Sequence, residues 1–246
     1  MIIEEYGSAN NKCIVLIHGS FVTGEMWQPE VTLLEKDYHV LIPTLNGHNP
    51  DEKVDFPGIE QEASNLIAAV KEHHDSDIYA IIGSSLGGTI AFEIASRNDL
   101  AIAHIVSDGG FFAPMSPLLA RFSTQIMTSA MIAMKNGNRL LQSALKESYP
   151  EPAFEMVQNT ITAMSCTSIH NVFHSSYCYQ MPANIDQVSA CIHVWYGSKE
   201  DAFVKKSARH IKDRVSSSIV KEFYGMRHGE LALVYPERYV QAIDQL

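Results

Sequence analysis

The five residues Gly83-Ser84-Ser85-Leu86-Gly87 give the clearest indication of how this chain folds. It has the pattern G-x-S-x-G, and it joins an apolar, strand-like run at residues 78–82 to a helix-like segment at residues 86–97. A serine at such a turn needs strained backbone, and small flanking residues let the chain approach itself closely. That geometry exposes the hydroxyl and aims the next backbone N–H groups at the same point. Because the pattern alone also fits a structural tight turn, its meaning depends on the rest of the chain.

Other apolar runs on both sides of this turn alternate with helix-like segments. A helix is predicted over residues 57–73, where apolar side chains recur at helical spacing. Continuous apolar strands that alternate with helices indicate a parallel sheet covered on both faces. We therefore predict an α/β fold with a mostly parallel sheet. Its strands are expected at residues 13–17, 38–42, 78–82, 101–106, 192–196 and 219–224.

The segment 112–188 breaks the alternation, because it contains no convincing strand. It is expected to be a helical lid inserted in a core formed by residues 1–111 and 189–246, over the sheet edge where ligands of open parallel sheets bind. Its methionines suit an adaptable apolar pocket, although each one alone also fits ordinary helix packing. The predicted helices lie near residues 118–135, 138–148, 152–164 and 168–179.

Composition excludes several classes of protein. The 246 residues are 46% hydrophobic and 19% charged, which is typical of a globular chain. A net charge of −10 argues against a nucleic-acid partner, since phosphate binding needs clustered basic residues, and a small-molecule substrate is expected instead. Four cysteines without metal-ligand spacing fit a reducing compartment. With no visible secretion signal and no apolar run of membrane-spanning length, a cytoplasmic location without a membrane span is expected.

A serine hydroxyl is a poor nucleophile until a base takes its proton. His228 lies between the last predicted strand and a final helix, beside glycine, which suits a mobile imidazole. The spacing of the other histidines suggests no metal site, and the chemistry implies no cofactor. We therefore predict that Ser85 is the nucleophile and His228 the base.

The base needs a carboxylate that orients it, and three candidates follow predicted strands. Glu200 and Asp201 share the loop after residues 192–196, where one can orient His228 while the other caps the helix that begins near Phe203. Asp108, at the end of the preceding strand, is the third candidate.

A tetrahedral intermediate also needs hydrogen-bond donors for its oxyanion. The backbone N–H of Leu86 follows the nucleophile, and the turn after His18-Gly19 offers the N–H of Ser20. The ring of His18 has a structural alternative, which is to hold that turn.

With Ser85, a post-strand acid and His228 in this order, the chain resembles the alpha/beta-hydrolase family over nearly its whole length. The resemblance also rests on His18-Gly19 and on the glycines that flank Ser85. The stretch 18–27, with a tryptophan nine positions after the histidine, is similar to the small esterase and hydroxynitrile-lyase branch. No cofactor or metal is implied, and the oligomeric state stays open.

The same branch bears on the choice of acid. Its acid loop runs Asp, any residue, Ile or Leu, Phe and an aliphatic residue. When this pattern is aligned with the chain without gaps, Glu200 takes the place of the acid and Phe203 that of the phenylalanine. The resemblance therefore favours Glu200 over Asp201, although the family's usual residue is aspartate.

Two further departures concern the surroundings of the site. Many members have Asp after the proline of the second strand, where this chain has Thr44, and His or Gln before the nucleophile, where it has Ser84. The resemblance implies a serine hydrolase that cleaves a carboxylic ester of a small or medium apolar substrate through an acyl-enzyme. The alternatives are cleavage of a lactone, a C–C bond or a cyanohydrin by the same triad, and a ligand-binding receptor with weak hydrolase activity. For cyanohydrins a lysine is expected near the pocket, and Lys199 and Lys205 are poorly placed by sequence.

Overall fold

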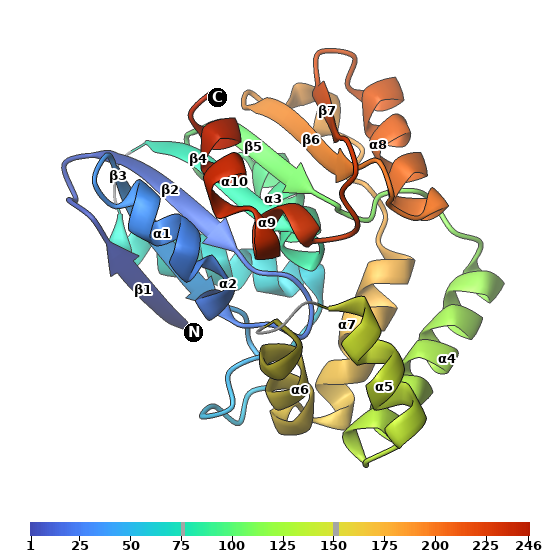
Figure 1. Ribbon diagram of the computed structural model, residues 1–246. Coiled ribbons are helices and arrows are strands. Elements are labelled where there is room, and N and C mark those ends of the chain that lie inside the picture. The colour runs from blue at the N-terminus through green and yellow to red at the C-terminus, as the bar shows by residue number, and fades with distance from the viewer. Residues whose placement is uncertain (75–76, 150–152) are drawn as a thin grey trace.

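The computed structural model describes residues 1–74, 77–149 and 153–246 and is built on a seven-stranded sheet (Figure 1). The strand order is β1-β3-β2-β4-β5-β6-β7, in which β1 runs antiparallel to β3 and the other neighbours are parallel. The predicted α/β fold with a mostly parallel sheet is therefore confirmed. The strands are β1 (Ile2–Tyr6), β2 (Lys12–Ile17), β3 (Tyr38–Thr44), β4 (Ile78–Ser84), β5 (Ile102–Asp108), β6 (Cys191–Gly197) and β7 (Ile219–Phe223).

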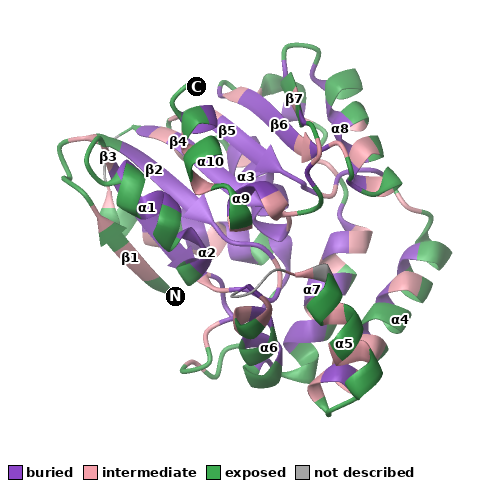
Figure 2. Cartoon of the chain, in the orientation of Figure 1, coloured by how far each residue is buried: buried purple, intermediate pink, exposed green. Residues whose placement is uncertain are grey.

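Helices cover both faces of the sheet, so its central strands are buried (Figure 2). On one face α1 packs against α10, and on the other α2 packs against α3 (Figure 1). Burial on both faces explains why the central strands read as continuous apolar runs. The helices of this core are η1 (Gly24–Trp27), α1 (Gln28–Leu34), α2 (Ile59–His73), α3 (Leu86–Arg97), α8 (Ala202–Arg214), α9 (Glu230–Val234) and α10 (Pro236–Ile243).

The sequence analysis missed β1, the strand at one edge of the sheet. Every residue of β1 pairs with β3, from Ile2 opposite Thr44 to Tyr6 opposite Val40. Glutamates interrupt the apolar pattern of β1, and its residues are partly or fully exposed. An edge strand has one free side and can carry charges there, so its sequence gives a weak signal.

Between β5 and β6 the chain forms a set of helices that we call the cap. The cap helices lie beyond the carboxyl ends of the central strands, and α4 packs against α7 (Figure 1). Their ends differ from the predicted ones by two residues or fewer, apart from the predicted start at Pro152, which lies outside the described residues. They are α4 (Pro117–Lys135), α5 (Arg139–Ser148), α6 (Ala153–Ala163) and α7 (Cys166–Cys178), followed by η2 (Ile185–Gln187).

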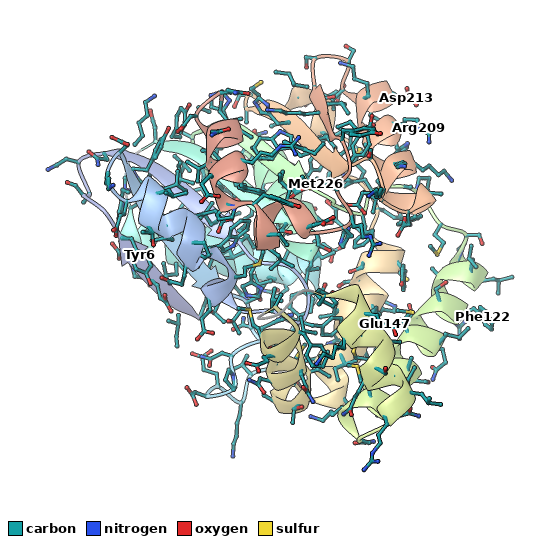
Figure 3. All side chains as sticks on the ribbon, viewed as in Figure 1. Tyr6, Phe122, Glu147, Arg209, Asp213 and Met226 are labelled. Carbon is teal, nitrogen blue, oxygen red and sulfur yellow. The ribbon has the colours of Figure 1, made fainter. Side chains whose placement is uncertain are left out.

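The outward side of α4 is apolar. Leu118, Phe122 and Ile126, four residues apart, are all exposed, and Phe122 points away from the body of the molecule (Figure 3). Spacing of four residues places them on one stripe of the helix. In the described part of the chain, however, no helix combines the length and apolar character needed to cross a membrane.

Three aromatic side chains pack together between α10, η1 and the sheet. The ring of Tyr239 in α10 lies 5.3 Å from that of Trp27 and 5.5 Å from that of Trp195, between ring centroids. All three side chains are fully buried. Truncating such a core aromatic residue costs about 3–5 kcal/mol, so this cluster anchors α10 and η1 to the sheet.

Candidate active site

Ser85 occupies the sharp turn between β4 and α3. Its backbone has a φ of 52° and a ψ of −112°, which is a strained conformation for a residue with a side chain. Two glycines make the turn possible. A Cβ atom on Gly83 would lie 2.1 Å from the backbone of Gly87, and one on Gly87 would lie 2.3 Å from the carbonyl oxygen of Ile17. The turn therefore requires glycine on both sides of the serine, and it leaves Ser85 partly exposed.

His228 is held against this serine by the loop between β7 and α9. The hydroxyl Oγ of Ser85 lies 2.9 Å from Nε2 of His228, which is hydrogen-bond distance. On the other side of the ring, Nδ1 lies 2.9 Å from Oε2 and 3.1 Å from Oε1 of Glu200. With a proton on Nδ1 donated to the carboxylate, Nε2 is free to accept the serine proton.

The two adjacent acids of the β6–α8 loop have different partners. Glu200 faces His228, and its side chain is almost completely buried, with 1% of its surface exposed. Asp201 is the N-cap of α8 and accepts hydrogen bonds from the backbone N–H groups of Phe203, at 2.7 Å, and Val204, at 3.0 Å. An N-cap aspartate satisfies donors that the helix itself leaves without acceptors. The structure thus brings Glu200, and not Asp201, to the histidine.

Opposing effects act on the pKa of His228. Enclosure of the ring by neighbouring atoms disfavours the protonated form, while the hydrogen bond and negative charge of Glu200, followed by the charges of Asp108 and Asp201, favour it. The effects that favour the protonated form together outweigh the effect of burial, so the pKa of His228 lies above its usual value. A raised pKa makes the imidazole a stronger proton acceptor.

Asp108, the third candidate acid, lies behind the histidine at the end of β5. Burial, with the negative charge of Glu200, raises the pKa of Asp108 to about 7, and the charge of His228 opposes this. Its Oδ2 atom is buried without a hydrogen-bond partner. The next residue, Gly109, lies directly under the imidazole, since a Cβ there would be 2.9 Å from Cε1 of His228. The nitrogens of that ring are hydrogen-bonded to Glu200 and Ser85, so Asp108 acts on it through charge.

The turn after β2 lies beside Ser85. A Cβ on Gly19 would be 3.5 Å from the Cβ of Ser85, and Ser20 lines the same cavity as the serine. The backbone N–H of Leu86 belongs to the first turn of α3 and has no acceptor within the helix. The N–H groups of Leu86 and Ser20 are thus the donors available for an oxyanion at this point.

His18 holds the turn that contains Ser20. Its Nδ1 donates to the carbonyl oxygen of Gly19 at 2.8 Å, and its Nε2 accepts from the N–H of Leu45 at 3.0 Å. Complete burial, together with the nearby His48, lowers the pKa of His18 to about 3. The ring is therefore neutral, and its contacts match the structural alternative considered for it.

A small cavity of about 60 Å³ adjoins Ser85. A second hollow of about 180 Å³ adjoins His228. Tyr149, directly after α5, lines both, as do His228 and Leu233. The first is walled mainly by Val22, Met26, Tyr149 and Leu233, and the second contains Glu147, Tyr149, Arg227 and Glu230.

These walls were missed by the sequence analysis. The methionine in the cavity is Met26 of η1, whereas Met134 and Met164 of the cap belong to the buried core. Nothing in the sequence marks Tyr149 as a wall of the cavity, because its position near Ser85 depends on how the cap helices pack. A methionine shortly after His18-Gly19 was the one signal available for Met26.

The model of a family described as the alpha/beta hydrolase family matches residues 14–242. An AB hydrolase superfamily protein of Gibberella zeae is 30% identical over 112 residues, which are 43% of this chain. Because the match covers only 40% of that relative, the chain aligns with less than half the length of the relative.

Solved structures match over nearly the whole chain. A structure reported for carboxylesterases of Nitrososphaera gargenis has a TM-score of 0.77 and 20% identity, and covers 99% of this chain and 93% of that one. The enol-lactonase of Burkholderia xenovorans LB400 has a TM-score of 0.76 and 16% identity, and covers 99% and 96%. At these identities the likeness concerns the fold.

Proposed function

The chain belongs to the alpha/beta hydrolase family, and from this premise we propose that it is a serine hydrolase that cleaves carboxylic esters. One observation carries the proposal. Ser85, His228 and Glu200 form a continuous chain of hydrogen bonds, with 2.9 Å on each side of the imidazole. A nucleophile, a base and a group that orients the base are what acyl transfer to serine requires.

In the proposed reaction Ser85 Oγ attacks the ester carbonyl carbon as His228 Nε2 takes its proton. Glu200 keeps the ring oriented and stabilises the imidazolium that forms. The N–H groups of Leu86 and Ser20 donate to the oxyanion. The imidazolium then returns the proton to the leaving alcohol, which leaves an acyl group on Ser85. Water, activated by the same histidine, attacks this acyl-enzyme and releases the acid.

The size of the cavity beside Ser85 supports esters with a small acyl group as the preferred substrates. Its volume of about 60 Å³ is comparable to two water molecules, at about 30 Å³ each. Val22, Met26 and Leu233 give it an apolar wall. The second hollow contains Arg227 and two glutamates, so a polar alcohol part fits there better than an alkyl chain.

Other reactions of the same three residues are separate candidates. Lactone opening needs no additional group, because a lactone is a cyclic ester. Cyanohydrin cleavage calls for a lysine near the pocket. Lys205 is engaged elsewhere, since its Nζ donates to the carbonyl oxygen of Ser198 at 2.6 Å. A ligand-binding receptor would keep the same geometry and release little product.

A substrate panel with product identification tests this proposal. It should contain p-nitrophenyl esters from acetate to octanoate, a simple lactone and a cyanohydrin. We expect many turnovers per protein on the short esters, with the carboxylic acid as product. Less than one turnover on every ester, together with tight binding of an ester, would favour the receptor instead.

The proposed setting is a reducing, cytoplasmic one with a small-molecule substrate. All four cysteines are free thiols, and Cys166 is exposed, which supports this setting. An exposed thiol persists where thiols are kept reduced.

A further inference from the structure

We propose that Cys13, His39 and His74 bind a Zn²⁺ ion at the end of the sheet opposite Ser85. The three ligand atoms, the Cys13 sulfur and one nitrogen from each ring, lie within 4.8 Å of one another. The residues are far apart in the sequence, which explains why their spacing predicted no metal site.

The fold brings the three residues together through strand register. Cys13 and His39 are direct partners in the parallel pair β2–β3, so their side chains project from the same face of the sheet. Both lie near the amino ends of their strands, whereas Ser85 follows the carboxyl end of β4. His74 comes immediately after the last turn of α2, the helix that covers this face.

His39 offers a nitrogen that has no other partner. Its side chain is almost fully buried, and its Nε2 lies 3.2 Å from Oε2 of Glu5. Because a carboxylate only accepts, the ring proton belongs on Nε2, and Nδ1 carries a free lone pair. That Nδ1 is buried without a hydrogen-bond partner. An unsatisfied buried polar atom costs about 1–3 kcal/mol, and coordination of an ion would remove this penalty.

The contact with Glu5 is the arrangement that zinc-binding histidines use. Such a histidine donates its second ring N–H to a carboxylate, which fixes the ring and makes the ligating nitrogen more basic. Glu5 also has a hydrogen bond with Nδ1 of His73, the residue before His74. The carboxylate therefore links two strands to the end of α2 and brings a negative charge close to the proposed ion.

The donor set selects the kind of ion. One thiolate and two imidazoles suit Zn²⁺, with bonds of about 2.3 Å to sulfur and about 2.0 Å to nitrogen. Those bonds require the ligand atoms to close to about 3.5 Å from one another, a shift of roughly 1 Å. On binding, the Cys13 thiol releases its proton to solvent as the sulfur–zinc bond forms. A water molecule takes the fourth position.

The ion has a short route to these ligands. His74 is partly exposed and lines a shallow surface depression together with Ala9, Asn10, Asn11 and Asp77. The imidazole of His74 lies against that of His39, with 5.4 Å between ring centroids. An ion that first meets His74 at the surface can therefore pass inward to the two buried ligands.

A second cluster, formed by His104, Cys191 and His193, has a similar composition and serves as an internal control. There the two rings already pair, with 3.2 Å between Nδ1 of His104 and Nε2 of His193. Burial disfavours protonation of both rings, and the positive charges of Lys12, near His104, and Lys221, near His193, add to this effect. The same charges would repel a metal cation, so this cluster is expected to stay free.

The proposed ion would tie β2 and β3 to the end of α2. Binding to the folded state alone raises stability with ion concentration. Since the site lies at the other end of the strands from Ser85, zinc is expected to raise the melting temperature without changing ester hydrolysis.

The test is a titration of the full chain with Co²⁺, a spectroscopic substitute for Zn²⁺. The protein is first stripped with a chelator and reduced. We expect a sulfur-to-cobalt charge-transfer band that saturates at one ion per chain and disappears when Zn²⁺ is added. Cys13→Ser should abolish the band, and Cys191→Ser should leave it unchanged. Glu5→Gln should weaken binding by about 10–100-fold.

His74→Ala keeps the test decisive if Cys13→Ser fails to fold, because His74 is partly exposed. It should weaken Co²⁺ binding by at least about tenfold while circular dichroism stays unchanged. Absence of the band in the wild-type protein at saturating Co²⁺ would overturn the proposal. So would a band that survives Cys13→Ser, an unchanged Co²⁺ affinity in His74→Ala, or loss of the band in Cys191→Ser.

Discussion

The proposed catalytic groups and the cap differ in how far their side chains are buried. Ser85 and Glu200 follow the largely buried strands β4 and β6, and only 1% of the Glu200 side chain is exposed. In the cap, by contrast, Leu118 is 82% exposed and Leu140 is 83% exposed. Reacting groups need geometry fixed to a fraction of an ångström, whereas a substrate wall can adapt. Changes in the core should therefore reduce hydrolysis of every substrate, and changes in the cap should alter the preference among substrates.

The largest effect is expected from Ser85→Ala. Without the hydroxyl no acyl-enzyme can form, so kcat should fall by about 10⁴- to 10⁶-fold on every ester in the panel. The measurement is steady-state hydrolysis of p-nitrophenyl acetate, with circular dichroism as the control for folding. Retention of most activity would remove Ser85 from the reaction.

Glu200→Gln should come next, with a loss of about 10³- to 10⁴-fold in kcat. The neutral amide neither stabilises the imidazolium nor reliably fixes the ring tautomer. Asp201→Asn is the matched control, since it changes the neighbouring carboxylate, which caps α8. It should cost at most about 1 kcal/mol of stability and leave kcat within a few-fold of the wild type. A larger loss of rate in Asp201→Asn than in Glu200→Gln would reverse the roles of the two acids.

Tyr149→Ala tests the cap side of the comparison. Removing the ring enlarges the small cavity, whose walls Val22, Met26 and Leu233 are apolar, so longer acyl chains should gain room. We expect the ratio of kcat/KM for hexanoate over acetate to rise by about tenfold, the scale of one methylene in an apolar pocket. Tyr149→Phe, which keeps the ring, should leave the ratio unchanged. An equal loss on all esters would place Tyr149 with the catalytic core.

The smallest effect concerns the pH dependence. The base must be neutral to accept the serine proton, so kcat/KM should fall as the pH drops through the pKa of His228, above the ordinary value of about 6.5. Asp108 contributes to raising that pKa. Asp108→Asn should therefore move the acid limb of the profile to lower pH, by less than about one pH unit, with kcat at high pH nearly unchanged. A shift to higher pH would contradict this electrostatic role.

Much of the core could be predicted from the sequence, because burial on both faces imposes continuous apolar strands. Ser85 and Glu200 each follow such a strand, and His228 follows the more exposed strand β7. The carboxyl ends of parallel strands meet at one edge. Their proximity in the structure follows from that topology, and their catalytic roles remain predictions. The choice between Glu200 and Asp201 needed the resemblance to a family, since either residue can cap a helix.

The remainder depends on contacts that strand and helix patterns do not encode. β1 has charged residues at a sheet edge, so its apolar signal is weak. Tyr149 reaches the serine only through the folded arrangement of the cap. Cys13 and His39 become neighbours through the register of two parallel strands, which residue spacing along the chain does not reveal.

If hydrolysis proceeds through an acyl group on Ser85, that group can be trapped and identified. The protein is mixed with p-nitrophenyl acetate, quenched in acid within the first turnover, digested and analysed by mass spectrometry. We expect one acetyl group per chain, on the hydroxyl of Ser85, formed together with a burst of p-nitrophenol. Acetylation of another residue, or steady turnover with no acetyl group on Ser85, would contradict this mechanism.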